Sequence, residues 1–151
     1  MRRVLDMGCG LGWWQPVVSE AWPRARYHGV EVSKHLCERL GWERGSVDTY
    51  RGRGQFDLVI CQGVLQYLDQ PTAQRAIENL GRLCRGALYL EVLTREDWRE
   101  HCDQKRTDGD VFLRAASFYR RNLSRDFITV GGGLFVQRNT PVTLYELEKL
   151  E

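Results

Sequence analysis

A glycine-rich turn near the start of the chain constrains the fold more than any other feature. Residues 4–12 read VLDMGCGLG, so a short apolar run that contains Asp6 leads into three alternate glycines. Glycine permits positive φ and leaves no Cβ between the backbone and a ligand. Residues 13–22 then show helical spacing, which makes the segment a β-turn-α unit. The glycines of this turn are Gly8, Gly10 and Gly12.

The β-turn-α pattern repeats along the first two thirds of the chain. Ser33 is a predicted N-cap and Gly41 a predicted stop for the helix that follows the second strand. Parallel strands need crossover connections, and the alternating helices supply them. The chain therefore predicts an α/β fold with a Rossmann-like, doubly wound and mostly parallel sheet. Strands are predicted at residues 2–7, 26–32, 45–50, 56–61 and 87–93, and helices at residues 13–22, 34–40 and 71–83.

The last third of the chain departs from this alternation. Residues 94–110 are polar and charged, which predicts a helix followed by an exposed loop suited to substrate specificity. Residues 111–123 return to helical spacing. Three glycines, residues 131–133, then join two apolar runs and predict an antiparallel hairpin, whereas a nicotinamide-binding domain continues with parallel units. The hairpin strands are predicted at residues 127–130 and 134–138, and a short amphipathic turn at residues 144–151.

Composition fits a single domain over residues 1–151. The chain has 151 residues, 42% of them hydrophobic, which suffices for one core. Its 22 basic and 20 acidic residues leave a net charge of +2, which argues against a nucleic-acid partner. No membrane-spanning run or signal peptide is legible, so we expect a cytoplasmic protein. Five cysteines without a C-x-x-C pair argue against disulfides and structural zinc, and no metal site is predicted.

Polar residues at the ends of other predicted strands complete a ligand-binding edge. Glu31 follows the glycine turn by about twenty residues, where an acid accepts hydrogen bonds from ribose hydroxyls. Residues 46–48 (Ser-Val-Asp) close the next strand and would recognise the edge of an adenine. The strand at residues 56–61 delivers Gln62 to the same edge, where ligands of open α/β sheets bind. Asp6 would repel a pyrophosphate at the glycine turn and favours a ligand that carries an ammonium group.

These segments resemble, in chain order, the motifs of class I S-adenosylmethionine-dependent methyltransferases. LDMGCGLG resembles their glycine motif, GVEVS the acidic ribose motif, GSVD the adenine-binding segment, and FDLVICQGVLQYL the strand-four motif. The resemblance runs from Val4 to about Leu93. It departs from the family pattern at Ser46, where many relatives have aspartate, and at Trp13-Trp14, which add aromatic bulk beside the glycine loop.

The resemblance implies that S-adenosylmethionine is the cofactor and S-adenosylhomocysteine the product. The glycine loop would wrap the methionine part, the motif II acid would hold the ribose, and Gln62 would lie near the methionine or the transferred methyl. The predicted cofactor-binding residues are Asp6, Gly8, Cys9, Gly10, Gly12, Glu31, Val32, Ser46, Val47, Asp48 and Gln62.

The methyl acceptor is expected to be a small or medium-sized molecule. A base is needed only when the acceptor must lose a proton, because the sulfonium already carries an activated methyl. His101, Tyr67 and Tyr119 are weak catalytic candidates, and Asp97 is a fourth side chain that could face a substrate. Surface or packing roles are commoner for each of them. Two alternatives remain open, a non-catalytic cofactor-binding partner or regulatory subunit and a methyltransferase that acts on RNA or protein.

The first strand begins almost at Met1, whereas related methyltransferases usually carry helices ahead of the glycine motif. We therefore expect a core without these cap helices and an uncovered edge beside Trp13 and Trp14. Adjacent helical positions cannot both point inward, so at least one of the two indoles should face outward. Either the cofactor cleft is open or a second copy of the chain covers this edge as a homodimer.

Overall fold

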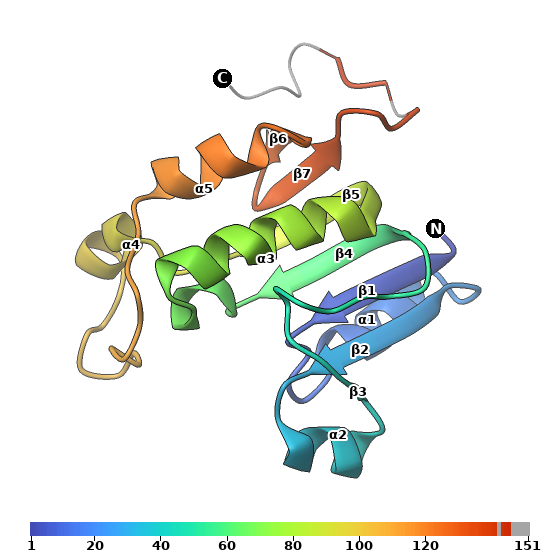
Figure 1. The fold of residues 1–151 in the computed structure, drawn as a ribbon, viewed down its shortest axis with the longest axis horizontal. Helices are drawn as coiled ribbons and strands as arrows, with labels where there is room; N and C mark the ends of the chain where they lie inside the picture. Colours follow the sequence, from blue (N-terminus) through green and yellow to red (C-terminus); the bar gives the residue numbers. More distant parts are fainter. Residues whose placement is uncertain (142, 146–151) are drawn as a thin grey trace.

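The computed structural model describes residues 1–141 and 143–145. Seven strands of this part of the chain form one sheet in the order β3-β2-β1-β4-β5-β7-β6 (Figure 1). Strands β1 to β5 pair in parallel, and β7 runs antiparallel to both β5 and β6. The mostly parallel α/β sheet with a terminal hairpin is thus confirmed. The strands are β1 (Arg3–Met7), β2 (Arg26–Glu31), β3 (Glu43–Arg44), β4 (Phe56–Gln62), β5 (Cys84–Glu91), β6 (Phe127–Gly131) and β7 (Leu134–Gln137).

Helices cover both faces of the sheet. Helix α3 (Gln70–Leu83) packs on β4 and β5 and also contacts α5 (Ala116–Leu123), which lies against β6. Helix α1 (Trp14–Ala21) lies behind the sheet as Figure 1 is drawn. The remaining helices are α2 (Lys34–Leu40), α4 (Arg95–Glu100) and a short 3₁₀ helix, η1 (Leu65–Tyr67).

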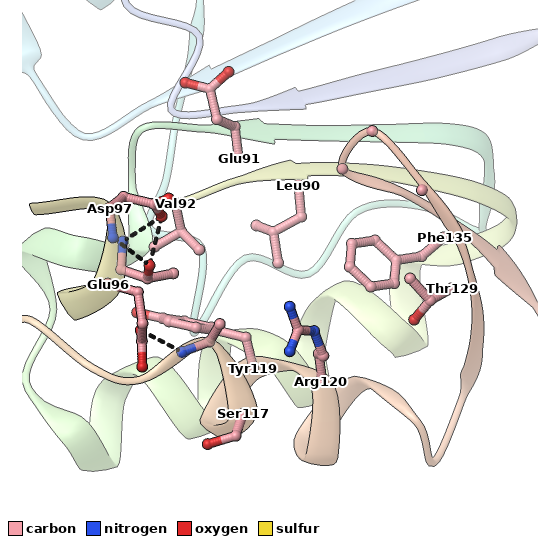
Figure 2. A pocket seen from close by; sticks show the side chains of 15 residues that line it. Leu90, Glu91, Val92, Glu96, Asp97, Ser117, Tyr119, Arg120, Thr129 and Phe135 are labelled. Atoms are coloured by element: carbon pink, nitrogen blue, oxygen red, sulfur yellow. Dashed lines mark hydrogen bonds between the residues drawn. The ribbon is translucent and has the colours of Figure 1, made fainter. Parts of the chain in front are cut away.

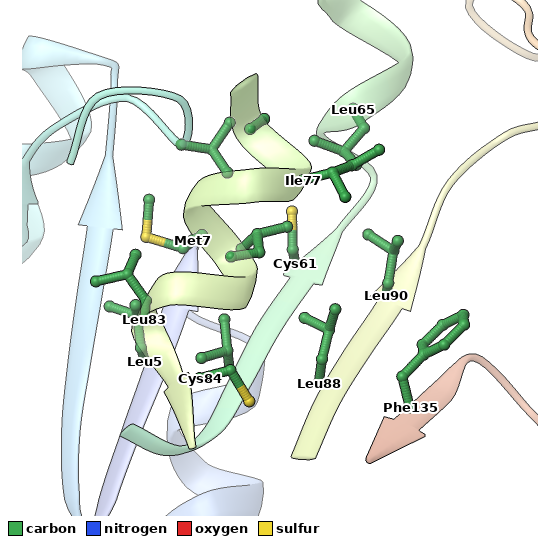
Figure 3. Packing of buried hydrophobic residues seen from close by; sticks show 14 of the residues in the cluster. Leu5, Met7, Cys61, Leu65, Ile77, Leu83, Cys84, Leu88, Leu90 and Phe135 are labelled. Carbon is green, nitrogen blue, oxygen red and sulfur yellow. The ribbon is translucent and has the colours of Figure 1, made fainter. Parts of the chain in front are cut away.

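Alternate residues of the central strands enter two separate cores, as expected for strands buried on both sides. Leu5 and Cys61 belong to the larger core, which Figure 3 shows packed beneath α3. Val4 and Ile60, each one position away, join Val18 of α1 in the smaller core. This arrangement fixes strands β1 and β4 at the centre of the sheet, so their carboxyl ends are rigid supports for the loops that follow.

The predicted helix ends at two positions are confirmed by their caps. The Ser33 hydroxyl accepts a hydrogen bond from the Leu36 N–H at the start of α2, and Gly41 ends that helix with φ 75°. The Asp69 carboxylate likewise accepts from the Thr72 N–H at the start of α3. Both helices therefore begin where the sequence places a short polar side chain.

The third strand was expected at residues 45–50, and that prediction is wrong. The strand is only Glu43–Arg44. A turn begins at Ser46, whose carbonyl accepts a hydrogen bond from the Tyr50 N–H at 2.8 Å. Buried Asn79 of α3 holds this turn, because its Nδ2 donates to the carbonyls of Val47 at 2.8 Å and Tyr50 at 3.0 Å. Backbone groups at these positions are thus satisfied by a side chain from a distant helix instead of a strand partner.

Two other boundaries differ from the prediction. Helix α5 begins at Ala116 instead of residue 111, because the preceding segment is held extended: the Phe112 N–H donates to the Gln66 carbonyl at 2.8 Å. Strand β5 begins at Cys84, directly after α3, so Gly86 lies inside the strand and does not separate the two elements. Of the amphipathic turn predicted at residues 144–151, residues 146–151 lie outside the described part of the chain. Within the part described, no helix has both the length and the apolar character needed to cross a membrane.

Replacing Gly86 by alanine tests the close approach of β4 and β5. A Cβ at this position would overlap the carbonyl oxygen of Asp57, which is backbone and has little freedom to move. We expect Gly86→Ala to lower the free energy of unfolding by about 1–3 kcal/mol, measured by urea denaturation. Gly109→Ala is the control, since its Cβ would make only an ordinary contact, 3.4 Å, with the Trp98 ring. Equal stability of the two variants would contradict the proposed crowding.

Candidate functional site

The glycine loop after β1 is held against the end of β2 by one carboxylate. Glu31 Oε2 accepts from the Gly10 N–H at 3.0 Å, and Oε1 accepts from the N–H groups of Val32 and Ser33, both at 2.9 Å. Glu31 is buried, with 8% of its surface exposed. A single side chain thus fixes the glycine loop and the start of the next loop relative to each other.

Trp42 supports the same loop from below, a contact that the sequence analysis missed. Its Nε1 donates to the Gly10 carbonyl at 3.0 Å. A Cβ at Gly12 or at Gly29 would come within 2.5 Å of the indole ring, and Gly12 has φ +78°. Both glycines are therefore required by the tryptophan that packs on them. The one sequence signal for this contact is that an aromatic residue, Trp42, directly follows the glycine that ends α2.

Asp6 lies beneath the loop and is almost fully buried. The Tyr27 hydroxyl donates to its carboxylate at 2.5 Å. Burial raises the pKa of Asp6 to about 6, against the lowering effect of the Tyr27 hydrogen bond, and the neighbouring charge of Glu31 raises it further. A cation placed near this carboxylate would lower its pKa and relieve the cost of burying its charge.

A cavity of about 320 Å³ lies between the ends of β1, β2 and β4. Its lining includes five of the predicted cofactor-binding residues, brought together from three separate loops. The lining also includes Tyr67, which is half exposed. The five residues are Gly8, Glu31, Val32, Ser46 and Val47.

Other predicted residues lie near this cavity without lining it. Cys9 is buried, and burial raises the pKa of its thiol to about 12. Asp48 accepts from the Ser46 hydroxyl at 2.6 Å and pairs with Arg75 at 3.3 Å, and these contacts hold its pKa below the usual value. The structure therefore gives Asp48 a local partner in the turn, beside the cavity instead of within it.

Gln62 lies at the end of β4 in a chain of side-chain hydrogen bonds. The Trp14 Nε1 donates to its Oε1 at 2.7 Å, and its Nε2 donates to Glu91 Oε2 at 3.0 Å. The Tyr89 hydroxyl donates to the same Glu91 oxygen at 3.1 Å. Trp13, by contrast, is 76% exposed, which confirms that at least one of the two adjacent indoles faces outward.

A second cavity of about 580 Å³ lies beyond the end of β5, where α4, α5 and the β6–β7 hairpin meet (Figure 2). Leu90, Val92 and Phe135 give it apolar walls, while its charged lining residues are Glu91, Glu96, Asp97 and Arg120. Because Glu91 lines this cavity and also contacts Gln62, the second cavity adjoins the strand-four edge.

Arg114 joins the two halves of this edge. Its buried guanidinium donates to the Leu65 carbonyl at 3.2 Å and to the Leu68 carbonyl in the segment after β4. It also donates to the Tyr119 hydroxyl at 3.2 Å. No carboxylate in the described part of the chain pairs with it. The segment before α5 is therefore docked on the β4 loop by a charged side chain whose hydrogen-bond acceptors are neutral and whose buried Nε has no partner among the described residues.

The three catalytic candidates, His101, Tyr67 and Tyr119, lie in different places. Tyr67 lines the smaller cavity, and Tyr119, which is buried, lines the larger one. Asp97 also lines the larger cavity, but its side chain is engaged in a capping box with Thr94 at the start of α4. His101 is exposed at the end of α4 and lines neither cavity. No shared acid-base centre is formed by these side chains.

The cysteines are free thiols, four of them buried and Cys102 partly exposed. In residues 1–141 and 143–145, no three His, Cys, Asp or Glu side chains are grouped so as to hold a metal ion.

Comparisons with known proteins identify the class. The chain matches the family model described as "Methyltransferase domain" over residues 1–131. It is 26% identical over 122 residues to the trans-aconitate 2-methyltransferase of Azoarcus sp. (strain BH72), covering 75% of this chain and 47% of that protein. It is 28% identical over 91 residues to the malonyl-[acyl-carrier protein] O-methyltransferase of Halalkalibacterium halodurans, covering 47% of this chain and 31% of that protein.

The fold agrees with this match. The structure is similar to that of the N-methyltransferase NodS from Bradyrhizobium japonicum WM9, with a TM-score of 0.65 and 16% identity, covering 91% of this chain and 79% of that chain. The architecture is that of class I S-adenosylmethionine-dependent methyltransferases, which confirms the resemblance of the motifs. The chain belongs to the methyltransferase domain family. It spans less than half the length of the two relatives compared by sequence.

The raised pKa of Asp6 predicts a pH-dependent cost to stability. The folded state binds this proton up to pH about 6, whereas the unfolded chain releases it near 3.8, the ordinary pKa of an aspartate. Stability therefore falls as pH rises through this window, and the cost is fully present above it. We expect the free energy of unfolding of Asp6→Asn, measured relative to the wild type by urea denaturation, to increase by about 2–3 kcal/mol as the pH rises from 4 to 7. The same change at exposed Asp103 serves as the control, and a gain at Asp6 that does not vary with pH would contradict the assignment.

Proposed function

We propose that this domain binds S-adenosylmethionine along the carboxyl edge of β1, β2 and β4 and transfers its methyl group to a small molecule. The observation that carries the proposal is the cavity beside the glycine loop. Glu31 lines this cavity and holds the loop in place through the Gly10 N–H. Membership of the methyltransferase family supports the reaction class, and the names of two relatives, which specify malonyl-[acyl-carrier protein] and trans-aconitate, support a small acceptor group.

The residues around the smaller cavity suit an adenosine. A carboxylate offers about four lone-pair sites, and Glu31 uses three of them on backbone N–H groups, so one site is left for a ribose hydroxyl. Val32 and Val47 provide apolar surface for a base, and Ser46 contributes polar atoms. A Cβ at Gly10 would meet no atom within 4 Å, so this part of the loop presents bare backbone to open space.

The remainder of the edge suits the methionine part and the acceptor. Asp6 supplies a buried negative charge beneath the glycine loop, complementary to an ammonium group. Gln62 is oriented at both ends, by Trp14 and by Glu91, before any ligand arrives. The cofactor, when bound, supplies a sulfonium-activated methyl group. The protein's part is then to hold an acceptor beside Gln62 and in line with that methyl, for which the larger cavity provides the space.

Glu31 provides the sharpest test of this proposal. Glu31→Gln places an NH₂ group against backbone N–H donors and removes an acceptor for the ribose, so we expect S-adenosylhomocysteine to bind about tenfold to a hundredfold more weakly in calorimetry. Glu38→Gln is the matched control, because Glu38 is exposed on α2 and pairs only with Lys34 at 3.6 Å. Unchanged affinity in Glu31→Gln would refute the ribose contact. Failure of the wild type to bind S-adenosylhomocysteine would refute the function.

A further inference from the structure

One charged group in the lining of the larger cavity, the Arg120 guanidinium, has no partner among residues 1–141 and 143–145. Glu91 accepts from Gln62 and Tyr89, and Glu96 Oε2 accepts from the Ala116 N–H at 3.0 Å. Asp97 accepts from the backbone and hydroxyl of Thr94. In the part of the chain that the structure describes, the Arg120 guanidinium makes no hydrogen bond or ion pair. The named charged lining groups are three acids and one arginine, and Arg120 is the member of this set whose hydrogen-bonding groups are all left for a ligand.

Arg120 is exposed on α5, and its side chain forms part of the cavity lining. Figure 2 shows its guanidinium extending from α5 into the space between Tyr119, Leu90 and Phe135. Two of the acids, Glu96 and Asp97, lie at the other side of the cavity in the first turn of α4, where backbone N–H groups offset negative charge. Backbone hydrogen bonds hold the pKa of Glu96 below its usual value. Arg120 lies in the last turn of α5, where helix carbonyls favour a positive charge, so each of these three side chains suits the helix that carries it.

The cavity has the size and surface of a small-molecule site. Its volume of about 580 Å³ lies within the usual range for ligand pockets, and its apolar walls are formed by Leu90, Val92 and Phe135. The β6–β7 turn closes one side, because the Leu90 N–H donates to the Gly133 carbonyl at 2.8 Å. Glu91 connects the cavity to Gln62, so a molecule that occupies it has one end near the strand-four edge.

We propose that this cavity binds the methyl acceptor and that Arg120 anchors a carboxylate of that acceptor. The inference rests on the proposed function for the identity of the occupant as acceptor, but not for the binding of the carboxylate itself. A guanidinium pairs with a carboxylate through two parallel N–H···O bonds, which also fixes the direction of the bound molecule. The acceptor is accordingly a carboxylic acid with a short apolar body, oriented with its acid group at α5 and its other end toward Gln62. Arg120 is a positioning and specificity residue.

Three probes with the same six-carbon body and different head groups test the anchor. Hexanoate, hexan-1-ol and hexan-1-amine are titrated separately into the protein, with and without saturating S-adenosylhomocysteine. Binding is followed by NMR at the Arg120 side-chain Nε–H and at the backbone amides of Thr129 and Gly132, which line the cavity. We expect hexanoate to bind about tenfold more tightly than hexan-1-ol, and hexan-1-amine to bind no better than the alcohol.

Two variants give the matched comparison. Arg120→Gln should reduce hexanoate binding to the level of the alcohol, followed at the two backbone amides. Arg121→Gln makes the same change in charge one position along α5, outside the cavity lining, and should leave hexanoate binding unchanged. Both variants should bind S-adenosylhomocysteine as the wild type does. If the wild type itself does not bind S-adenosylhomocysteine, the proposed function is refuted, but the carboxylate anchor is not. Equal binding of hexanoate and hexan-1-ol, preference for the amine, or full hexanoate affinity in Arg120→Gln would overturn the anchor.

Discussion

The cofactor edge depends on the contact between Glu31 and the backbone of the glycine loop. Strands β1 and β2 bring the two loops to the same edge, but the carboxylate converts proximity into a fixed distance. Trp42 acts on the same loop, because its indole N–H donates to the Gly10 carbonyl and its ring packs on Gly12 and Gly29. A loop rich in glycine has a large conformational entropy to lose, and these two contacts offset that loss before a ligand binds. Preorganisation of this kind places the cost of ordering in folding instead of binding.

The burial of Asp6 shows the opposite balance. Its charge is unfavourable in the folded protein alone, and only a hydrogen bond from Tyr27 and the proposed ligand ammonium compensate for it. A site that stores an unfavourable charge sacrifices stability for affinity. The glycine loop and Asp6 thus contribute to one site through different terms, since the first is preorganised and the second is destabilised.

Much of the fold was predictable from local patterns, and the errors share a physical cause. The glycine turn, the helix ends at Ser33 and Gly41 and the terminal hairpin each depend on residues close in sequence. The third strand and the start of α5 were placed wrongly because Asn79 and the Gln66 carbonyl, both distant in sequence, decide the local backbone. The site divides in the same way. Glu31 and Gln62 are strand-end residues that spacing locates, whereas the roles of Trp42, Tyr27 and Arg120 arise from tertiary packing that no spacing reports.

Arg114 makes the docking of the acceptor half on the cofactor half an all-or-none event. A buried guanidinium that loses its carbonyl partners is left charged in a medium of low polarity, and that state is far less stable than either the docked form or one fully open to water. Its contacts with the loop after β4 reach two carbonyls, those of Leu65 and Leu68, so displacement of the guanidinium loses both together. A partly undocked position of the segment before α5 is therefore costly, since it leaves a charged group short of partners in a dry environment.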